Sequence, residues 1–250
     1  MDHISSIQLM PKPFEWIDIS AGQVTLGGSQ WANGGYIHGA TGFDVPGFAI
    51  AKYPVTNSQY AKFIEADGYN QQKWWTKIGW KVREAEGWQE PRYWKNERLV
   101  HPDYPVITVS WHECNAFCRW LSASTGEDIK LPTEQQWQRA AQGDTQWVFP
   151  YGSEFNASRC NFNAEDTTAV THYEGKGDSP FGVVDMSGNV WEWCSTKYKA
   201  NNNTPHGTDL KVLRGGSRKY DIPEFLRVDC RNAGLPETFD FNVGFRIARF

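Results

Sequence analysis

The second half of this chain lacks any long stretch of helical periodicity, and this constrains the fold more than any other feature. From about Gln142 onward, Gly, Asn, Pro and Asp recur every few residues between short aromatic runs. Such residues form turns and end helices. Aromatic residues make up 15% of the 250 residues, and 13 residues are Trp. We therefore expect this half to consist of turns and short strands that pack through flat aromatic rings.

The first half carries the regular elements. The segment FEWIDISAGQVTLG alternates apolar and polar residues around Gly22, which predicts two short strands joined by a turn, and FDVPGFAIAKYPVT predicts a second pair. Capping residues predict three helices, which begin after Thr56, Ser110 and Thr133. No internal repeat or linker is evident, so residues 1–250 are predicted to form a single domain.

The charge balance argues against two classes of partner. The formal net charge is -4 and no stripe of Lys and Arg occurs, so nucleic acid is not expected. The N-terminus lacks a basic segment followed by a long apolar one, and no window of about 18 uninterrupted apolar residues occurs, so no membrane association is expected. We expect a cytoplasmic protein that binds an unknown protein or small molecule, and the oligomeric state stays open.

The cysteines and a tryptophan-rich span each allow two interpretations. The five cysteines contain no CxxC motif, which predicts reduced thiols. Cys114 and Cys118 fall on one face of a predicted helix, so we expect core packing there rather than metal binding. The span from Trp74 to Trp94 could be a sugar-stacking platform or an insertion packed on its own domain, and we favour packing.

Several segments, read in order, are similar to one known family. They are AGQVTLG, YPVTNSQYAKF, YPVITVSWHECNAFCRWLS, KLPTEQQWQRAA, GVVDMSGNVWEWC, LRGGS and NVGFRIAR. As a set they cover nearly the whole chain and resemble the formylglycine-generating-enzyme (sulfatase-modifying factor) family. The resemblance implies an α+β fold, a variant of the C-type lectin fold with short antiparallel strands, two or three helices and much irregular structure.

The same resemblance implies structural calcium. In relatives, a calcium ion is held by a carboxamide or carboxylate, two backbone carbonyls and a Glu, and such oxygen ligands suit this hard cation. Carried over position by position, the resemblance implies one site at Asp185, Gly188, Val190 and Glu192, and a second at Asn161, Phe162, Asp166 and Thr168. The alternative is that Glu192 only accepts hydrogen bonds from loop amides.

The catalytic metals of the family are not expected here. The sulfatase-activating oxidases bind copper(I) through two cysteines five residues apart just after GGS, and these positions hold Tyr220 and Phe225. Related sulfoxide synthases bind iron through three histidines, supplied largely by a helical domain that is not within these residues. No two of the six histidines, His3, His38, His101, His112, His172 and His206, form an HxH or HxxxH pair. We therefore predict no catalytic residue and neither copper nor iron.

One branch of this fold, the variable proteins of diversity-generating retroelements, keeps a frame of residues and rewrites those between them. The matching frame residues are Gly215, Gly216, Ser217, Pro223, Arg227, Arg231, Pro236, Gly244, Phe245 and Arg246. Within residues 214–250, the resemblance then implies ligand-binding gap residues at Arg218, Lys219, Tyr220, Asp221, Phe225, Val228, Asp229, Cys230, Asn232, Leu235, Thr238, Phe239, Asp240 and Phe241.

Two functions from different classes follow from these observations. The first is a non-catalytic protein that binds a ligand or another protein through the gap residues, in a C-terminal surface that a retroelement diversifies. The alternative is a metal-dependent oxidoreductase of the formylglycine-generating-enzyme and sulfoxide-synthase superfamily, acting on a peptide or small molecule. The intact frame and the missing cysteine pair favour binding over oxidation.

Overall fold

The computed structural model describes residues 4–27, 40–198 and 209–250. Its helices are α1 (Ser6–Leu9), α2 (Asn57–Glu65), α3 (Lys77–Glu86), α4 (Trp111–Thr125) and α5 (Glu134–Gln142), with short 3-10 turns at Gly68–Asn70, Gln72–Trp74, Ala157–Arg159 and Pro223–Leu226. The strands are β1 (Trp16–Ile19), β2 (Gly22–Leu26), β3 (Thr41–Val45), β4 (Phe48–Ala51), β5 (Ile129–Lys130), β6 (Trp191–Lys197), β7 (Lys211–Arg214), β8 (Arg231–Gly234), β9 (Val243–Gly244) and β10 (Ala248–Arg249).

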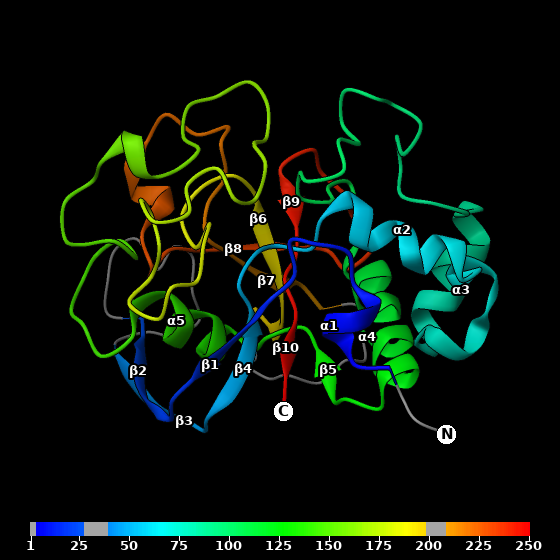
Figure 1. The fold of residues 1–250 in the computed structure, drawn as a ribbon, viewed down its shortest axis with the longest axis horizontal. Coiled ribbons are helices and arrows are strands. Elements are labelled where there is room, and N and C mark those ends of the chain that lie inside the picture. Colours follow the sequence, from blue (N-terminus) through cyan, green and yellow to red (C-terminus); the bar gives the residue numbers. More distant parts are fainter. Residues whose placement is uncertain (1–3, 28–39, 199–208) are drawn as a thin grey trace.

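The strands form two four-stranded sheets and one hairpin. One sheet has the order β1-β4-β10-β5, the other has the order β8-β7-β6-β9, and β2 pairs with β3. Figure 1 shows α2, α3 and α4 on one side of these sheets, and α5 with the β2–β3 hairpin on the other. All pairs are antiparallel except β6 with β9. The C-terminal stretch thus supplies strands to both sheets and fastens them together.

The predicted strands are present, but their pairing differs from the prediction. Because β1 pairs with β4 and β2 pairs with β3, the two pairs are nested rather than consecutive. The sequence predicted each strand from its alternation of residue types, and this alternation carries no information on the partner strand. The second half of the chain has the predicted mixture of turns and short strands.

The three predicted helices are confirmed, with their caps. The side chains of Thr56, Ser110 and Thr133 each accept a hydrogen bond from the backbone N–H three residues on, at 3.3, 3.2 and 3.1 Å. The structure also contains α1 and α3, so the described residues form five α-helices rather than two or three. Thr76 caps α3 by accepting from the Gly79 amide at 2.9 Å.

The main core is aromatic and includes most of the tryptophan-rich span. Tyr60 stacks on Phe117 with ring centroids 5.4 Å apart. Trp75 is buried in this core, and the other tryptophans of the span, Trp74, Trp80, Trp88 and Trp94, pack against it. The packed-insertion interpretation therefore holds for the tryptophans. Cys114 and Cys118 are buried without a disulfide, as predicted, and no described helix is long and apolar enough to cross a membrane.

Candidate functional site

The frame arginines of the C-terminal stretch are buried and cross-link distant segments. Arg246 is fully buried and donates to both carboxylate oxygens of Glu192, at 2.6 and 2.7 Å. Its remaining donors reach the carbonyls of Ala51 and Val184. A planar guanidinium can make such a bidentate contact and still bond carbonyls, which a lysine cannot do. The Arg246 side chain therefore links β4, β6 and the loop before β6.

A second buried network joins the C-terminal strands to helix α5. Glu134, at the first position of α5, accepts from Arg231 at 2.7 Å through both oxygens and from Arg214 at 2.9 Å. Arg214 also donates to the side chain of Gln138 at 2.6 Å. Both buried arginines therefore share one buried carboxylate away from water, and Arg214 Nε and Arg231 Nη1 have no hydrogen-bond partner among the described residues. The frame arginines Arg231 and Arg246 thus link segments that are far apart in the sequence.

The two positions that hold cysteines in the copper oxidases lie together. The rings of Tyr220 and Phe225 have centroids 4.4 Å apart and are tilted by 34°. The indole N–H of Trp191 donates to the Tyr220 hydroxyl at 3.3 Å. Neither side chain supplies a thiolate, so a two-cysteine copper(I) site does not fit this place. The aromatic pair packs against the main core instead.

Six of the gap residues line one cavity, which we call the C-terminal cavity. It has a volume of about 510 Å³ and is bordered by the indoles of Trp191 and Trp193. The gap residues that line it are Tyr220, Asn232, Leu235, Thr238, Phe239 and Asp240. Its walls thus combine aromatic faces with amide, hydroxyl and carboxylate groups, which is typical of pockets for small ligands.

Three gap residues are buried, and the prediction that they face a partner is wrong for them. Arg218, Val228 and Cys230 are 8%, 2% and 1% exposed. The Arg218 guanidinium donates to the carbonyls of Glu165 and Phe241, so it fastens the loop that precedes β9. Val228 packs in a core cluster. Burial raises the pKa of the Cys230 thiol to about 11, so this cysteine is an inert thiol.

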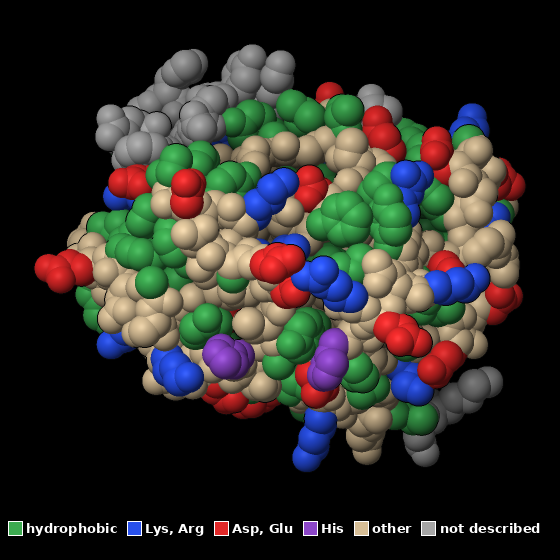
Figure 2. Space-filling view, turned by 90° about the horizontal axis from the view of Figure 1, so that it is seen from above, with side chains coloured by type: hydrophobic (Ala, Val, Ile, Leu, Met, Phe, Trp, Pro, Cys, Tyr) green, Lys and Arg blue, Asp and Glu red, His purple; other side chains and the backbone are tan. Residues whose placement is uncertain are grey.

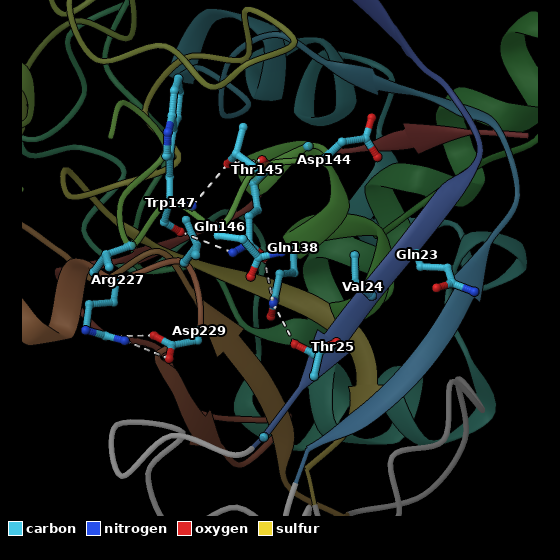
Figure 3. Close-up of a pocket in the computed structure, with 15 residues that line it drawn as sticks. Gln23, Val24, Thr25, Gln138, Asp144, Thr145, Gln146, Trp147, Arg227 and Asp229 are labelled. Atoms are coloured by element: carbon cyan, nitrogen blue, oxygen red, sulfur yellow. Dashed lines mark hydrogen bonds and ion pairs between the residues drawn. The ribbon is translucent and has the colours of Figure 1, made fainter. Parts of the chain in front are cut away.

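Val228 and Asp229 border a different cavity, shown in Figure 3. This second cavity measures about 440 Å³ and lies between β2, the end of α5 and residues 227–229. Arg227 and Asp229 form a bidentate ion pair across 2.8 and 3.0 Å at its edge. Gln138 donates from the side of α5 to the Thr25 carbonyl at 2.9 Å. The gap residues therefore do not form one continuous lining: six border the C-terminal cavity, Val228 and Asp229 border this one, and Lys219 and Asp221 are exposed.

The segment after α3 contacts the gap residues, and the sequence gave no indication of this. The Tyr93 and Phe241 rings, which are 48% and 43% exposed, have centroids 4.9 Å apart and are tilted by 34°. The Arg92 guanidinium lies 3.9 Å from the centre of the Phe239 ring. Thr108 bonds to both sides of this contact, since its N–H donates to the Asp240 carbonyl and its hydroxyl to the Arg92 carbonyl. Figure 1 shows the two loops side by side. Nothing in the sequence of the tryptophan-rich span indicates that Tyr93 contacts the C-terminal stretch.

The first predicted set of calcium ligands is engaged in other bonds. Both oxygens of Glu192 accept from Arg246, and one also accepts from the Trp137 indole at 2.7 Å. A guanidinium in contact with this carboxylate disfavours a cation there, so the complete ligand set does not fit in this conformation. Asp185 is buried with one carboxylate oxygen lacking a partner among the described residues, and burial raises its pKa to about 7.

The second predicted calcium set is tied together by an amide. Asn189 donates to the Asp185 carboxylate at 2.9 Å and to the Thr168 carbonyl, and it accepts from the Asn161 side chain and the Thr168 N–H at 3.1 Å. The Asp166 carboxylate instead pairs with Arg98. The two sets are thus neighbours, linked by Asn189. Calcium at either set is a prediction from the resemblance alone, and the bonds that Glu192, Asp166 and Asn161 already make disfavour it in this conformation.

No group of three or more His, Cys, Asp or Glu side chains gathers as a metal site within residues 4–27, 40–198 and 209–250. Of the histidines considered for iron, His101, His112 and His172 lie in these ranges. His3, His38 and His206 lie outside the described residues.

The comparisons with known proteins identify the family. A model of the sulfatase-modifying factor enzyme 1-like domain matches residues 8–250. The chain belongs to this family. It is 31% identical over 233 residues to the hercynine oxygenase of Mycobacterium tuberculosis, an alignment that covers 82% of this chain and 53% of that protein. The chain therefore spans about half the length of this curated relative.

Two solved structures share the fold across nearly their whole length. PvdO from Pseudomonas aeruginosa matches with a TM-score of 0.72 at 22% identity, and the match covers 94% of this chain and 93% of PvdO. Variable protein 1 from Treponema denticola matches with a TM-score of 0.70 at 19% identity, covering 94% and 95%. The α+β, C-type lectin-like fold predicted from the sequence is thus confirmed, and so is the resemblance to a variable protein at the level of the fold.

Proposed function

We propose that this domain is a non-catalytic binding protein that holds a ligand or a partner protein at its C-terminal cavity. The observation that carries the proposal is the gathering of six gap residues around this one cavity. Buried arginines fix the backbone on which these residues stand. A rigid scaffold with variable side chains around a pocket suits binding, because few side chains must be ordered when the ligand arrives.

The composition of the surface supports the same proposal. Leu235 and Phe241 are 44% and 43% exposed, and Tyr93 adds a further exposed ring beside them. Exposed aromatic residues are common at sites of protein and ligand contact. Figure 2 shows the loop-bearing face, where hydrophobic patches lie between charges of both signs. This mixed surface differs from the basic stripe that binds a phosphate backbone.

We further propose that a retroelement diversifies the gap residues. The fold of the Treponema denticola variable protein supports this, as does the match of the frame residues. The proposal predicts a reverse transcriptase gene and a near-identical template repeat of the last ~100 nucleotides beside this gene. A neighbourhood without both would remove the diversification step but not the binding proposal. The free thiols fit a cytoplasmic location, which we also propose.

Oxygen consumption tests the non-catalytic part of the proposal. Purified protein is loaded with Cu(I), mixed with a cysteine-containing peptide, and followed with an oxygen electrode. We expect uptake equal to that of Cu(I) and peptide without protein, because Tyr220 and Phe225 cannot supply thiolates. Protein-dependent turnover with oxidation of the peptide cysteine would overturn the proposal.

The alternative function, a metal-dependent oxidoreductase, is favoured by one observation. The chain is 31% identical to a hercynine oxygenase over 82% of its length. This alternative predicts stoichiometric iron or copper after anaerobic purification, and oxygen uptake with a thiol and a peptide or small-molecule acceptor. Metal analysis that finds neither ion, together with no uptake after Fe(II) is added, would exclude it.

A further inference from the structure

The second cavity, between β2, the end of α5 and residues 227–229, is lined mainly by polar side chains. Its volume of about 440 Å³ lies within the usual range of pockets for small ligands. No described residue lines both this cavity and the C-terminal cavity. The uncharged polar side chains around it are Gln23, Thr25, Gln138, Gln142, Thr145 and Gln146. The function proposed for the C-terminal cavity leaves this polar cavity unexplained.

One tryptophan stands at the side of this cavity and is left out of the core. Of the 13 tryptophans, Trp31 lies outside the described residues, and Trp147 alone among the others is exposed, at 39%. Trp147 belongs to none of the hydrophobic clusters that the described residues form. Its indole therefore offers a flat apolar face at the edge of a polar cavity.

The backbone of Trp147 is held by side chains at the end of α5. Its N–H donates to the Thr145 hydroxyl at 3.2 Å, and its carbonyl accepts from the Gln142 amide at 3.1 Å. Gln142 in turn accepts from Gln138 at 3.3 Å, and Gln138 donates to the Thr25 carbonyl at 2.9 Å. This chain of amides joins α5, β2 and Trp147 without a ligand, so little of it must be ordered when a ligand arrives.

Every charged side chain among the described residues that line this cavity is already paired. Asp144 pairs with the buried guanidinium of Arg139 at 2.5 Å. Arg227 and Asp229 pair with each other at 2.8 and 3.0 Å. An ionic ligand would lose hydration on entry and find no unpaired charge of opposite sign. The cavity therefore favours a neutral ligand.

The uncharged side chains suit hydroxyl groups. A carboxamide carries both a donor and an acceptor, and so does a hydroxyl group. Gln146 is exposed, and its side chain makes no hydrogen bond to a described residue. Gln23 is also exposed and bonds Asp44 through Nε2 at 2.9 Å, which leaves its Oε1 available. Figure 3 shows Gln23 and Trp147 on opposite sides of the cavity.

From these observations we propose that the second cavity binds a neutral, hydroxyl-rich molecule of the hexopyranose type. The apolar C–H face of the sugar ring lies on the Trp147 indole, and its hydroxyl groups bond Gln146 and Gln23. The site is separate from the C-terminal cavity and does not depend on the function proposed there. The stacking platform thus lies outside the span from Trp74 to Trp94, whose tryptophans pack on the main core.

Nuclear magnetic resonance titrations at pH 7 test the proposal through the indole N–H signal of Trp147, assigned by its loss in Trp147→Ala. The neutral probes are methyl β-glucopyranoside and methyl β-galactopyranoside, and the charged probes are glucosamine and glucuronate. We expect at least one methyl glycoside to bind saturably with a Kd of about 1–10 mM, and each charged probe to bind at least about three-fold more weakly. The proposal is wrong if neither glycoside saturates below about 100 mM, or if either charged probe binds as tightly as the better glycoside.

Two exposed aromatic positions locate the site. Trp147→Ala removes the stacking face at a position outside the core clusters, and we expect at least about ten-fold weaker binding of the better glycoside, followed by calorimetry. Phe250→Ala removes a ring that is 51% exposed and does not line the cavity, so the glycoside should bind as it does to the unmodified protein. Equal binding by both variants would place the sugar elsewhere and overturn the assignment.

Two substitutions of Gln146 test the polar contact. Gln146→Leu keeps the size of the side chain and removes its donor and acceptor, so we expect about five-fold weaker binding of the glycoside. Gln89→Leu makes the same change at an exposed glutamine that does not line the cavity and should have no effect. Gln146→Glu adds an unpaired carboxylate, so glucosamine should then bind at least about three-fold more tightly than glucuronate. If Gln146→Leu and Gln89→Leu bind the glycoside alike, the contact with Gln146 is wrong.

Discussion

The frame residues and the gap residues alternate along one stretch of chain but occupy opposite environments. Arg231 and Arg246 are 1% and 0% exposed and bonded on several sides. Leu235 and Phe241, a few residues away, are 44% and 43% exposed. The difference teaches that position along this stretch determines environment: the frame arginines are buried and bonded, whereas six of the fourteen gap residues are exposed and only three are buried.

The physical basis of this division is the number of partners that each side chain has. A buried arginine in a bidentate ion pair cannot be replaced without leaving a carboxylate uncompensated in a dry environment. An exposed Leu or Phe has water on one side and loses little when it is exchanged. The cost of a substitution in this stretch should therefore depend on the partners that the side chain loses.

Removal of a frame arginine should have the largest effect. Arg246→Ala leaves the Glu192 carboxylate buried without its cation, and we expect a loss of about 3–5 kcal/mol in the free energy of unfolding, measured with urea. The double variant Glu192→Met, Arg246→Met removes both charges and should lose less than the single variant. If the single variant were as stable as the unmodified protein, the frame would not depend on this pair.

The buried carboxylate of Glu113 should make the stability of the protein depend on pH. Burial raises the pKa of Glu113 from 4.5 to about 7, so the folded state favours its protonated form. Its contribution to stability is complete below pH 4.5 and is lost as the pH rises to about 7, which amounts to about 2–3 kcal/mol. Glu113→Gln should remove this decline.

The comparison of Glu113→Gln with the unmodified protein must be made at each pH, because two other groups titrate in the same range. The raised pKa of Asp185 adds to the decline, and the lowered pKa of His112 reduces stability below pH 6.5. The difference between the two proteins cancels both. A difference in unfolding free energy that stays constant from pH 4.5 to 8 would contradict the assignment.

Among the gap residues, burial should separate costly from neutral substitutions. Val228→Ala removes buried methyl groups and should cost about 2 kcal/mol. Leu235→Ser and Phe241→Ser act at exposed positions and should change the unfolding free energy by less than about 0.5 kcal/mol. Thermal unfolding of the three variants measures this. Similar costs at all three positions would remove the distinction between buried and exposed gap residues.

Calcium should have the smallest effect. Arg246 already neutralises Glu192, and Asn189 already links Asp185, Asn161 and Thr168. We therefore expect the same midpoint of thermal unfolding in calcium and in EDTA. A clear rise of the midpoint in calcium, lost in Asp185→Asn, would show that the ion binds and that Glu192 or its neighbours rearrange to accept it.

Local signals in the sequence predicted the helices well and the burial of particular residues poorly. Thr56, Ser110 and Thr133 each cap a helix within one turn of sequence, so these helices could be predicted. Helix α3 has its own cap at Thr76 and a left-handed glycine, Gly87, at its end. These cap residues indicate a helix, but we interpreted the segment only through its tryptophans.

The candidate site could be predicted only as a stretch of chain. The frame and gap residues were found from the sequence, but Arg218 is buried because of carbonyls from residues 165 and 241, which only the folded chain brings together. Likewise, the contact of Tyr93 with Phe241 joins segments far apart in sequence. Pairing between distant strands and loops depends on tertiary packing, which local patterns do not encode.

A substitution scan of residues 214–250 tests the division between buried, bonded positions and more exposed positions most directly. Every position is varied in a displayed library, and the resistance of each variant to protease reports its folding. We predict that most substitutions are tolerated at Tyr220, Asn232, Leu235, Thr238 and Phe241, and that few are tolerated at Arg214, Arg218, Val228, Arg231 and Arg246. Equal tolerance in the two groups would contradict the account.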